Sequence, residues 1–182
     1  MSTVITTIAL AFAGYAATYL NGLRLAERQA RLTRVNSQLS DFYGPLFALM
    51  QTNGRAYDAF AEKYARPDGR DPFRHETPPT ERELAEWRLW ATTVFLPNIQ
   101  AMRDVVVNQA DLLVEEEMPP VLLQLCAHVA GYEVTAVRWA EAQHEEHLSL
   151  IPFPGRELKQ YTRDQFIRLK REQTKLLGRS RS

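Results

Sequence analysis

The chain has 182 residues, a single cysteine, and 22 basic and 22 acidic side chains. This length suffices for one domain with a hydrophobic core but not for two comfortable ones, and the lone Cys126 excludes an internal disulfide. The zero net charge hides a partition, because residues 44–155 carry 9 basic and 17 acidic side chains, whereas residues 156–182 carry 9 and 3. The sequence therefore predicts an acidic body with a basic C-terminal end.

An apolar run without a charged side chain, Val4 to Leu20, lies near the start of the chain. A run of this length is at the short end of what crosses a bilayer as a helix. Basic side chains follow it directly, which predicts a single-pass anchor over residues 1–23 with the rest of the chain in the cytoplasm. A cleaved signal peptide and an alanine-rich buried helix are the alternatives. The basic side chains expected to contact lipid headgroups are Arg24, Arg28, Arg31 and Arg34.

Positions that step alternately by three and four continue from this run into the following helix. They are small or polar inside the expected span and mostly large and apolar after it, as in helices that pack first in lipid and then in water. The pattern predicts a homodimer or contact with another membrane protein, but from Leu32 onward packing against other helices of the same chain is favoured over a dimer, because a seam this short outside the membrane is marginal for a coiled coil. The predicted association seam comprises Gly14, Thr18, Asn21, Leu25, Leu32, Val35, Leu39 and Phe42.

The rest of the chain shows helical periodicity and no convincing strand alternation. Gly44-Pro45 and Pro97 are expected to break or kink two helices, and Thr80 and Glu83 have the spacing of a capping box. The sequence thus predicts an all-α bundle of four or five helices over residues 24–177, followed by a disordered basic tail, 178–182. The expected helices cover 46–65, 80–112 with an interruption at Pro97, 120–143 and 157–177, and a polar loop covers 66–79.

Two histidines, His144 and His147, stand three residues apart among glutamates. On one helix face they could bind a metal ion. The segment lacks a known zinc or di-iron spacing, so a solvated helix terminus is the alternative. His128 falls on an apolar stripe and is expected at the edge of the core, as a hydrogen-bonded packing residue.

Nothing in the sequence indicates a nucleophilic catalytic group or a phosphate-binding loop. The basic C-terminal helix is amphipathic, which favours packing on the bundle or on lipid headgroups over nucleic-acid binding. We therefore expect no cofactor and no nucleic-acid partner, with membrane lipid as the partner that the sequence indicates most directly.

Several short stretches occur in the same order as in a known group of proteins. They are Ser40–Leu49, which contains FYGPL, Trp90 to Asn98, Met118-Pro119, His128 and Ser149 to Pro154. Together they resemble a family of uncharacterised bacterial single-pass inner-membrane proteins. The resemblance implies a bacterial inner-membrane location and supplies no activity and no catalytic residue.

The anchor, the seam and the missing catalytic motif together predict a function. We expect a membrane-anchored cytoplasmic helical module that mediates protein–protein association and is not an enzyme. Two alternatives belong to other classes. One is a metal-dependent enzyme with a His/Glu site, and the other is a membrane-surface sensor or lipid-binding domain.

Overall fold

The protein is described here from a computed structural model that covers residues 2–66 and 78–178, with the side chains of residues 2–9, Ala11 and Ala13 left undescribed. Over these residues the chain is helical and contains no strand, which confirms the predicted all-α class. Four continuous helical rods account for the fold. They are α1 (Ser2–Ser37) with η1 (Gln38–Tyr43) and α2 (Gly44–Lys63); α3 (Glu81–Trp90) with η2 (Ala91–Phe95) and α4 (Leu96–Asn108); α5 (Pro120–Ala140); and α6 (Gly155–Leu176).

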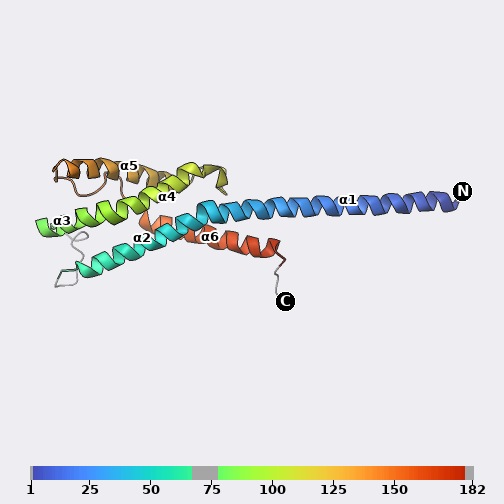
Figure 1. Ribbon diagram of the computed structural model, residues 1–182, viewed down its shortest axis with the longest axis horizontal. Coiled ribbons are helices and arrows are strands. Elements are labelled where there is room, and N and C mark those ends of the chain that lie inside the picture. The colour runs from blue at the N-terminus through green and yellow to red at the C-terminus, as the bar shows by residue number, and fades with distance from the viewer. Residues whose placement is uncertain (1, 67–77, 179–182) are drawn as a thin grey trace.

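Four of these segments, α2, α3–α4, α5 and α6, lie side by side along the long axis and form the body of the molecule (Figure 1). α1 continues from α2 and leaves the body, so that its N-terminal half extends far beyond the other helices. The C-terminal end of α6 lies beside the C-terminal third of α1. The short η3 turn (Ala110–Leu112) ends the second rod.

Of the break or kink predicted at Gly44-Pro45 and at Pro97, the break is wrong, because the chain stays helical through both prolines. A π-helical turn precedes each proline, with Gly44 N–H bonded to Leu39 O and Leu96 N–H bonded to Ala91 O, five residues back. Proline lacks the N–H that an α-helix needs, and its ring clashes with the carbonyl four residues earlier. The wider turn accommodates both defects by adding one residue to the turn.

Glycine is required in the first of these π turns. A Cβ atom at residue 44 would overlap the Leu39 carbonyl oxygen, which accepts the Gly44 N–H bond. At the second π turn, two threonine hydroxyls donate to backbone carbonyls of the preceding turn, with Thr92 Oγ1 2.8 Å from Arg88 O. The two prolines are thus tolerated through different neighbouring side chains.

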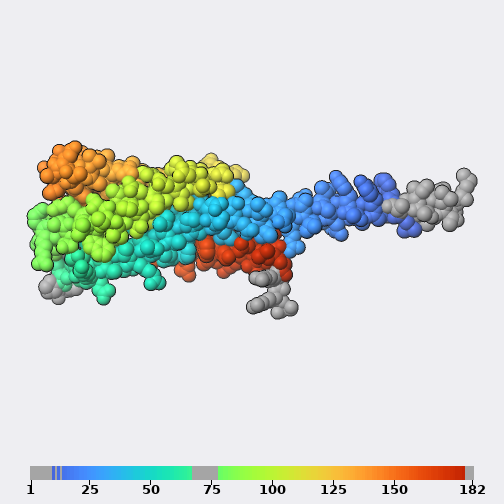
Figure 2. Space-filling view, viewed as in Figure 1, coloured from blue at the N-terminus to red at the C-terminus, as the bar shows by residue number. Residues whose placement is uncertain are grey.

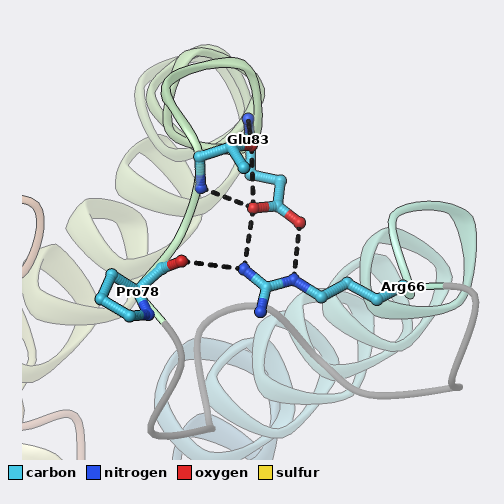
Figure 3. Close-up of polar contacts among 4 residues, drawn as sticks. Arg66, Pro78 and Glu83 are labelled. Carbon is cyan, nitrogen blue, oxygen red and sulfur yellow. Dashed lines mark hydrogen bonds and ion pairs between the residues drawn. The ribbon is translucent and has the colours of Figure 1, made fainter.

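The predicted capping box at the start of α3 is confirmed. Thr80 Oγ1 accepts from Glu83 N–H at 3.3 Å, and Glu83 Oε2 accepts from Thr80 N–H at 2.6 Å. Figure 3 shows that Arg66 forms a bidentate ion pair with the same carboxylate and also donates to Pro78 O. The Arg66 guanidinium and the Thr80 N–H hold the pKa of Glu83 down, at about 2. This clamp joins the two sides of the predicted polar loop, of which residues 67–77 lie outside the described part.

The hydrophobic core runs the length of the body. Its centre is built from fully buried side chains of every rod, among them Phe42, Leu46, Met102, Leu125 and Leu158. An aromatic cluster closes the end of the body near the α3 N-terminus, where Phe60 packs within 6 Å of the rings of Trp87, Trp90 and Phe95. This aromatic end forms one wall of the cleft described below.

Candidate functional site

The predicted association seam divides into two parts. Val35, Leu39 and Phe42 are buried in the core of their own chain, and Leu32 is half-buried. The N-terminal members are exposed, because no other described helix reaches that far along α1. These exposed members are Gly14, Thr18, Asn21 and Leu25. Figure 2 shows this part of α1 as a single helix standing out from the body.

The N-terminal half of α1 also exposes large apolar side chains on several faces. Exposure on all sides is unfavourable in water for a helix that is this apolar, and it is typical of a helix that lies in lipid or against a partner. The side chains before residue 10 lie outside the described ones, so the predicted span Val4–Leu20 is described only in part. The exposed side chains are Leu10, Phe12, Tyr15, Tyr19, Leu20, Leu23 and Leu25.

Three of the four arginines that were predicted to contact headgroups form contacts within the protein. Arg28 Nε donates to Leu176 O at 2.7 Å, and Arg31 Nε pairs with Glu172 Oε1 at 2.7 Å. Arg34 donates to the Asp111 carbonyl. The first contact places a cation at the negative end of the α6 dipole, where it is favourable. Arg28 and Arg31 therefore hold α1 against the C-terminal end of α6, and Arg34 holds it against η3.

α5 ends at Ala140, earlier than expected, so the two candidate metal ligands do not share a helix face. His144 and His147 lie in an irregular segment, residues 141–154, which we call the strap. His144 is exposed and His147 is half-buried. Over residues 2–66 and 78–178, no three His, Cys, Asp or Glu side chains gather closely enough to hold a metal ion.

The strap is held to the body mainly through its backbone carbonyls. Side chains of α3 and α5 donate to four of them, and each donor is neutral. These bonds join Trp139 Nε1 to Glu146 O (2.7 Å), Trp87 Nε1 to His147 O (2.9 Å), His128 Nδ1 to Ile151 O (2.5 Å) and Gln124 Nε2 to Pro152 O (3.1 Å). Gly131 lets the strap approach α5, because a Cβ atom there would lie 2.6 Å from Ser149 Oγ.

His128 is buried in the core, as its position on the apolar stripe of α5 indicated. A carbonyl oxygen can only accept, so the bond to Ile151 O fixes the proton on Nδ1 and leaves Nε2 as an acceptor. Burial lowers the pKa of the imidazole, and the bond to Ile151 O opposes this only in part. The neutral ring therefore acts as a fastening for the strap.

A cleft of about 800 Å³ lies between the strap, the start of α6 and the wall formed by α2, η2, α4 and α5. This volume is within the range of about 300–1,000 Å³ that small-molecule sites occupy. Most of its lining is apolar, with two basic side chains on the α6 side. The lining includes Trp87, Phe95, Ile99, Tyr132, Arg156 and Lys159.

The inner wall of the cleft contains neutral polar groups. Tyr132 is buried, and its hydroxyl has no hydrogen-bond partner among the described residues. Burial raises the pKa of this phenol, although the nearby Trp87 indole opposes the shift. Asn53 is also buried, and its Oδ1 accepts from Asn98 Nδ2 at 3.4 Å. The inner wall can thus offer hydrogen bonds but no charge.

A second apolar surface lies on the outer face of α5. Within the described part of the chain, α5 is the helix that is long and apolar enough to cross a membrane. Its most apolar stretch of 18 residues has a mean hydropathy of 1.2, and 33% of that stretch is buried. Its inner side chains, such as Leu125 and Val129, are in the core, whereas Leu123, Val134 and Val137 are exposed. α5 lies against α4 in the body, so its composition matches that of a core helix with one uncovered face.

Sequence reasoning found His128 but missed the cleft and the residues that hold the strap. The two tryptophans that donate to the strap, Trp87 and Trp139, lie in apolar helices, where the sequence does not distinguish them from core residues. Polar residues within apolar stripes were the signal in the sequence that could have indicated buried polar groups. Asn53 and Thr135 are two examples, and both are buried. The chain matches no known family model, no curated protein and no solved structure, so its function is argued from its own geometry.

Proposed function

We propose that this chain is a bacterial single-pass inner-membrane protein whose body is a cytoplasmic, non-enzymatic module for protein–protein association. The observation that carries the proposal is the N-terminal half of α1, which extends from the body with apolar and aromatic side chains exposed. Such a helix buries this surface only in a bilayer or against a partner. The run of arginines after residue 23 assigns the body to the cytoplasmic side.

The proposal assigns the anchor to α1 and not to α5. A spanning α5 would have to withdraw Leu125, Val129 and Trp139 from the core of the body, where each is buried. An anchor at α1 leaves every core contact in place. The buried face of α5 therefore supports α1, rather than α5, as the proposed anchor.

Arginine substitutions distinguish the two helices. We expect F12R/Y15R to release the full-length chain from membranes that are washed with alkaline carbonate, because both positions lie near the centre of the span and arginine there costs about 2.5–3.5 kcal/mol. The matched control is L123R/V134R on the exposed face of α5, which should leave the chain in the membrane fraction. Retention of the first variant, or release of the second, would contradict the anchor at α1.

Association is proposed through the exposed part of the seam. Small residues at Gly14 and Thr18 allow close approach of two helices in lipid, and Thr18 Oγ1 donates to Gly14 O at 2.9 Å, so its hydroxyl needs no other partner. The partner at this seam is α1 of a second copy of the chain. The exposed face of α5 is the alternative surface, for a partner in water.

Cysteine crosslinking in native membranes tests the seam. In a Cys126→Ser background, T18C should form an oxidised dimer and L20C should not, because residues two apart point in very different directions on a helix. Equal crosslinking at both positions, or none at either, would rule out a dimer through this seam. If the chain is a dimer but neither cysteine forms a crosslink, the exposed face of α5 becomes the candidate interface.

A further inference from the structure

We propose that the cleft beneath the strap binds a single-chain amphiphile with an anionic head. In this complex Arg156 and Lys159 hold the head, and the chain lies on the apolar inner wall. The site goes beyond the proposed function and does not rest on it, because the cleft is formed entirely by the body.

The inner wall is suited to an apolar chain. Trp87, Phe95 and Ile99 line it and are buried against the core behind them. The strap adds apolar side chains at the mouth, where Leu150 is 93% exposed although it lines the cleft. A large apolar side chain exposed to this extent is available to contact a chain that enters at the mouth.

The rim on the α6 side is suited to an anion. Arg156 and Lys159 line the cleft, are exposed, and form no hydrogen bond or ion pair through their side chains with any described residue. Both lie in the first turns of α6, whose N-terminal N–H groups receive no side-chain cap. The positive end of the helix dipole adds to the two cations.

The lining of the rim carries more basic than acidic side chains. A smaller hollow shares Arg156 and Lys159 with the cleft and adds Arg163 and Asp164. Asp58 lines the α2 side of the cleft and forms no ion pair with either cation. An incoming anion therefore meets two cations that form no ion pair with a described carboxylate, and a charge-assisted hydrogen bond to each is available.

The polar groups deeper in the cleft fix the orientation of the ligand. His128 is neutral, and the Tyr132 phenol stays protonated because burial raises its pKa. A charged head placed there would lose its hydration without meeting a counter-charge. The head therefore stays at the rim and the chain points inward, under the strap.

Photolabelling of the full-length chain in phosphatidylcholine nanodiscs tests this site. The probes are a long-chain fatty acid, an alkyl phosphate and a fatty alcohol, each with a diazirine near the end of the chain. We expect the anionic probes to label peptides from residues 87–99 and 128–153, and the alcohol to label them far less. The carboxylate and phosphate arms show which anion the rim prefers. Labelling of α1 reports simple partition into the bilayer.

Two variants with the same charge change separate the rim from the rest of α6. R156Q/K159Q should reduce labelling of the cleft peptides by about tenfold, because two charge-assisted hydrogen bonds are lost. R168Q/K170Q, two exposed positions on α6 that do not line the cleft, should leave it unchanged.

A competition experiment on the unsubstituted protein does not depend on whether any variant folds. Unlabelled fatty acid or alkyl phosphate should displace the corresponding probe from the cleft peptides, and unlabelled alcohol should not. Labelling confined to α1, equal labelling by all three probes, or unchanged labelling of R156Q/K159Q would overturn the proposal. A failure of the anchor test under Proposed function would leave these outcomes unaffected, since they concern the body alone.

Discussion

The first rod contains two regions that share one backbone and differ in what surrounds them. In α1, the seam residue Leu25 is 66% exposed, whereas in α2 Leu46 is fully buried. The same stepping by three and four residues runs through both regions. The stepping therefore defines a face of the helix but not its partner, which is lipid or another chain in one region and the body in the other.

Truncating a leucine in each region gives the largest expected difference. Leu46→Ala should lower the free energy of unfolding by about 2–5 kcal/mol, because it leaves a cavity in the core. Leu20→Ala should change it by less than about 0.5 kcal/mol. Urea unfolding of the full-length chain in mild detergent, followed by tryptophan fluorescence, measures this, since all three tryptophans lie in the body. Equal losses for both variants would mean that the N-terminal half of α1 belongs to the body.

Glycine-to-alanine substitutions sharpen the same contrast with a smaller effect. Gly44→Ala should destabilise the body by about 1–3 kcal/mol, because its Cβ atom would overlap the Leu39 carbonyl oxygen. Gly22→Ala meets nothing within 4 Å and should be neutral, or raise helix stability by up to about 1 kcal/mol. Thermal unfolding monitored by circular dichroism would report the opposite signs. A neutral result at residue 44 would show that η1 can relax to an α-helix.

Acid should affect the body and leave the projecting half of α1 unchanged. Burial lowers the pKa of His128 in the folded state, so the unfolded chain binds a proton first as the pH falls. The contribution of His128 is thus complete above about pH 6.5 and declines from there down to the lowered folded pKa. Urea midpoints measured between pH 5 and pH 8 should show this slope, and His128→Gln should remove most of it. A slope that survives the substitution would assign the pH dependence to other groups.

Local patterns were predictable from the sequence, and contacts between distant segments were not. The capping box at Thr80 and Glu83 depends on residues three apart, and it is present as expected. The prolines were misjudged because a π turn depends on the freedom to insert one residue, which no periodicity reveals. The cleft could not be foreseen, since its lining comes from all four rods and from the strap. The strap itself depends on the indole of Trp87, which is 60 residues away from the carbonyl that it binds.

The extra residue in η1 also sets how the projecting helix is rotated relative to the body. Each residue of an α-helix spans about 100°, so deletion of one residue from η1 would turn α1 by about that angle about its own axis. Arg28 and Arg31 would then face away from the C-terminal end of α6, and the row Gly14–Thr18 would point toward a different neighbour. The π turn before Pro45 thus sets the rotation of α1 about its own axis relative to the body. It thereby determines which face of α1 lies on the same side as α6.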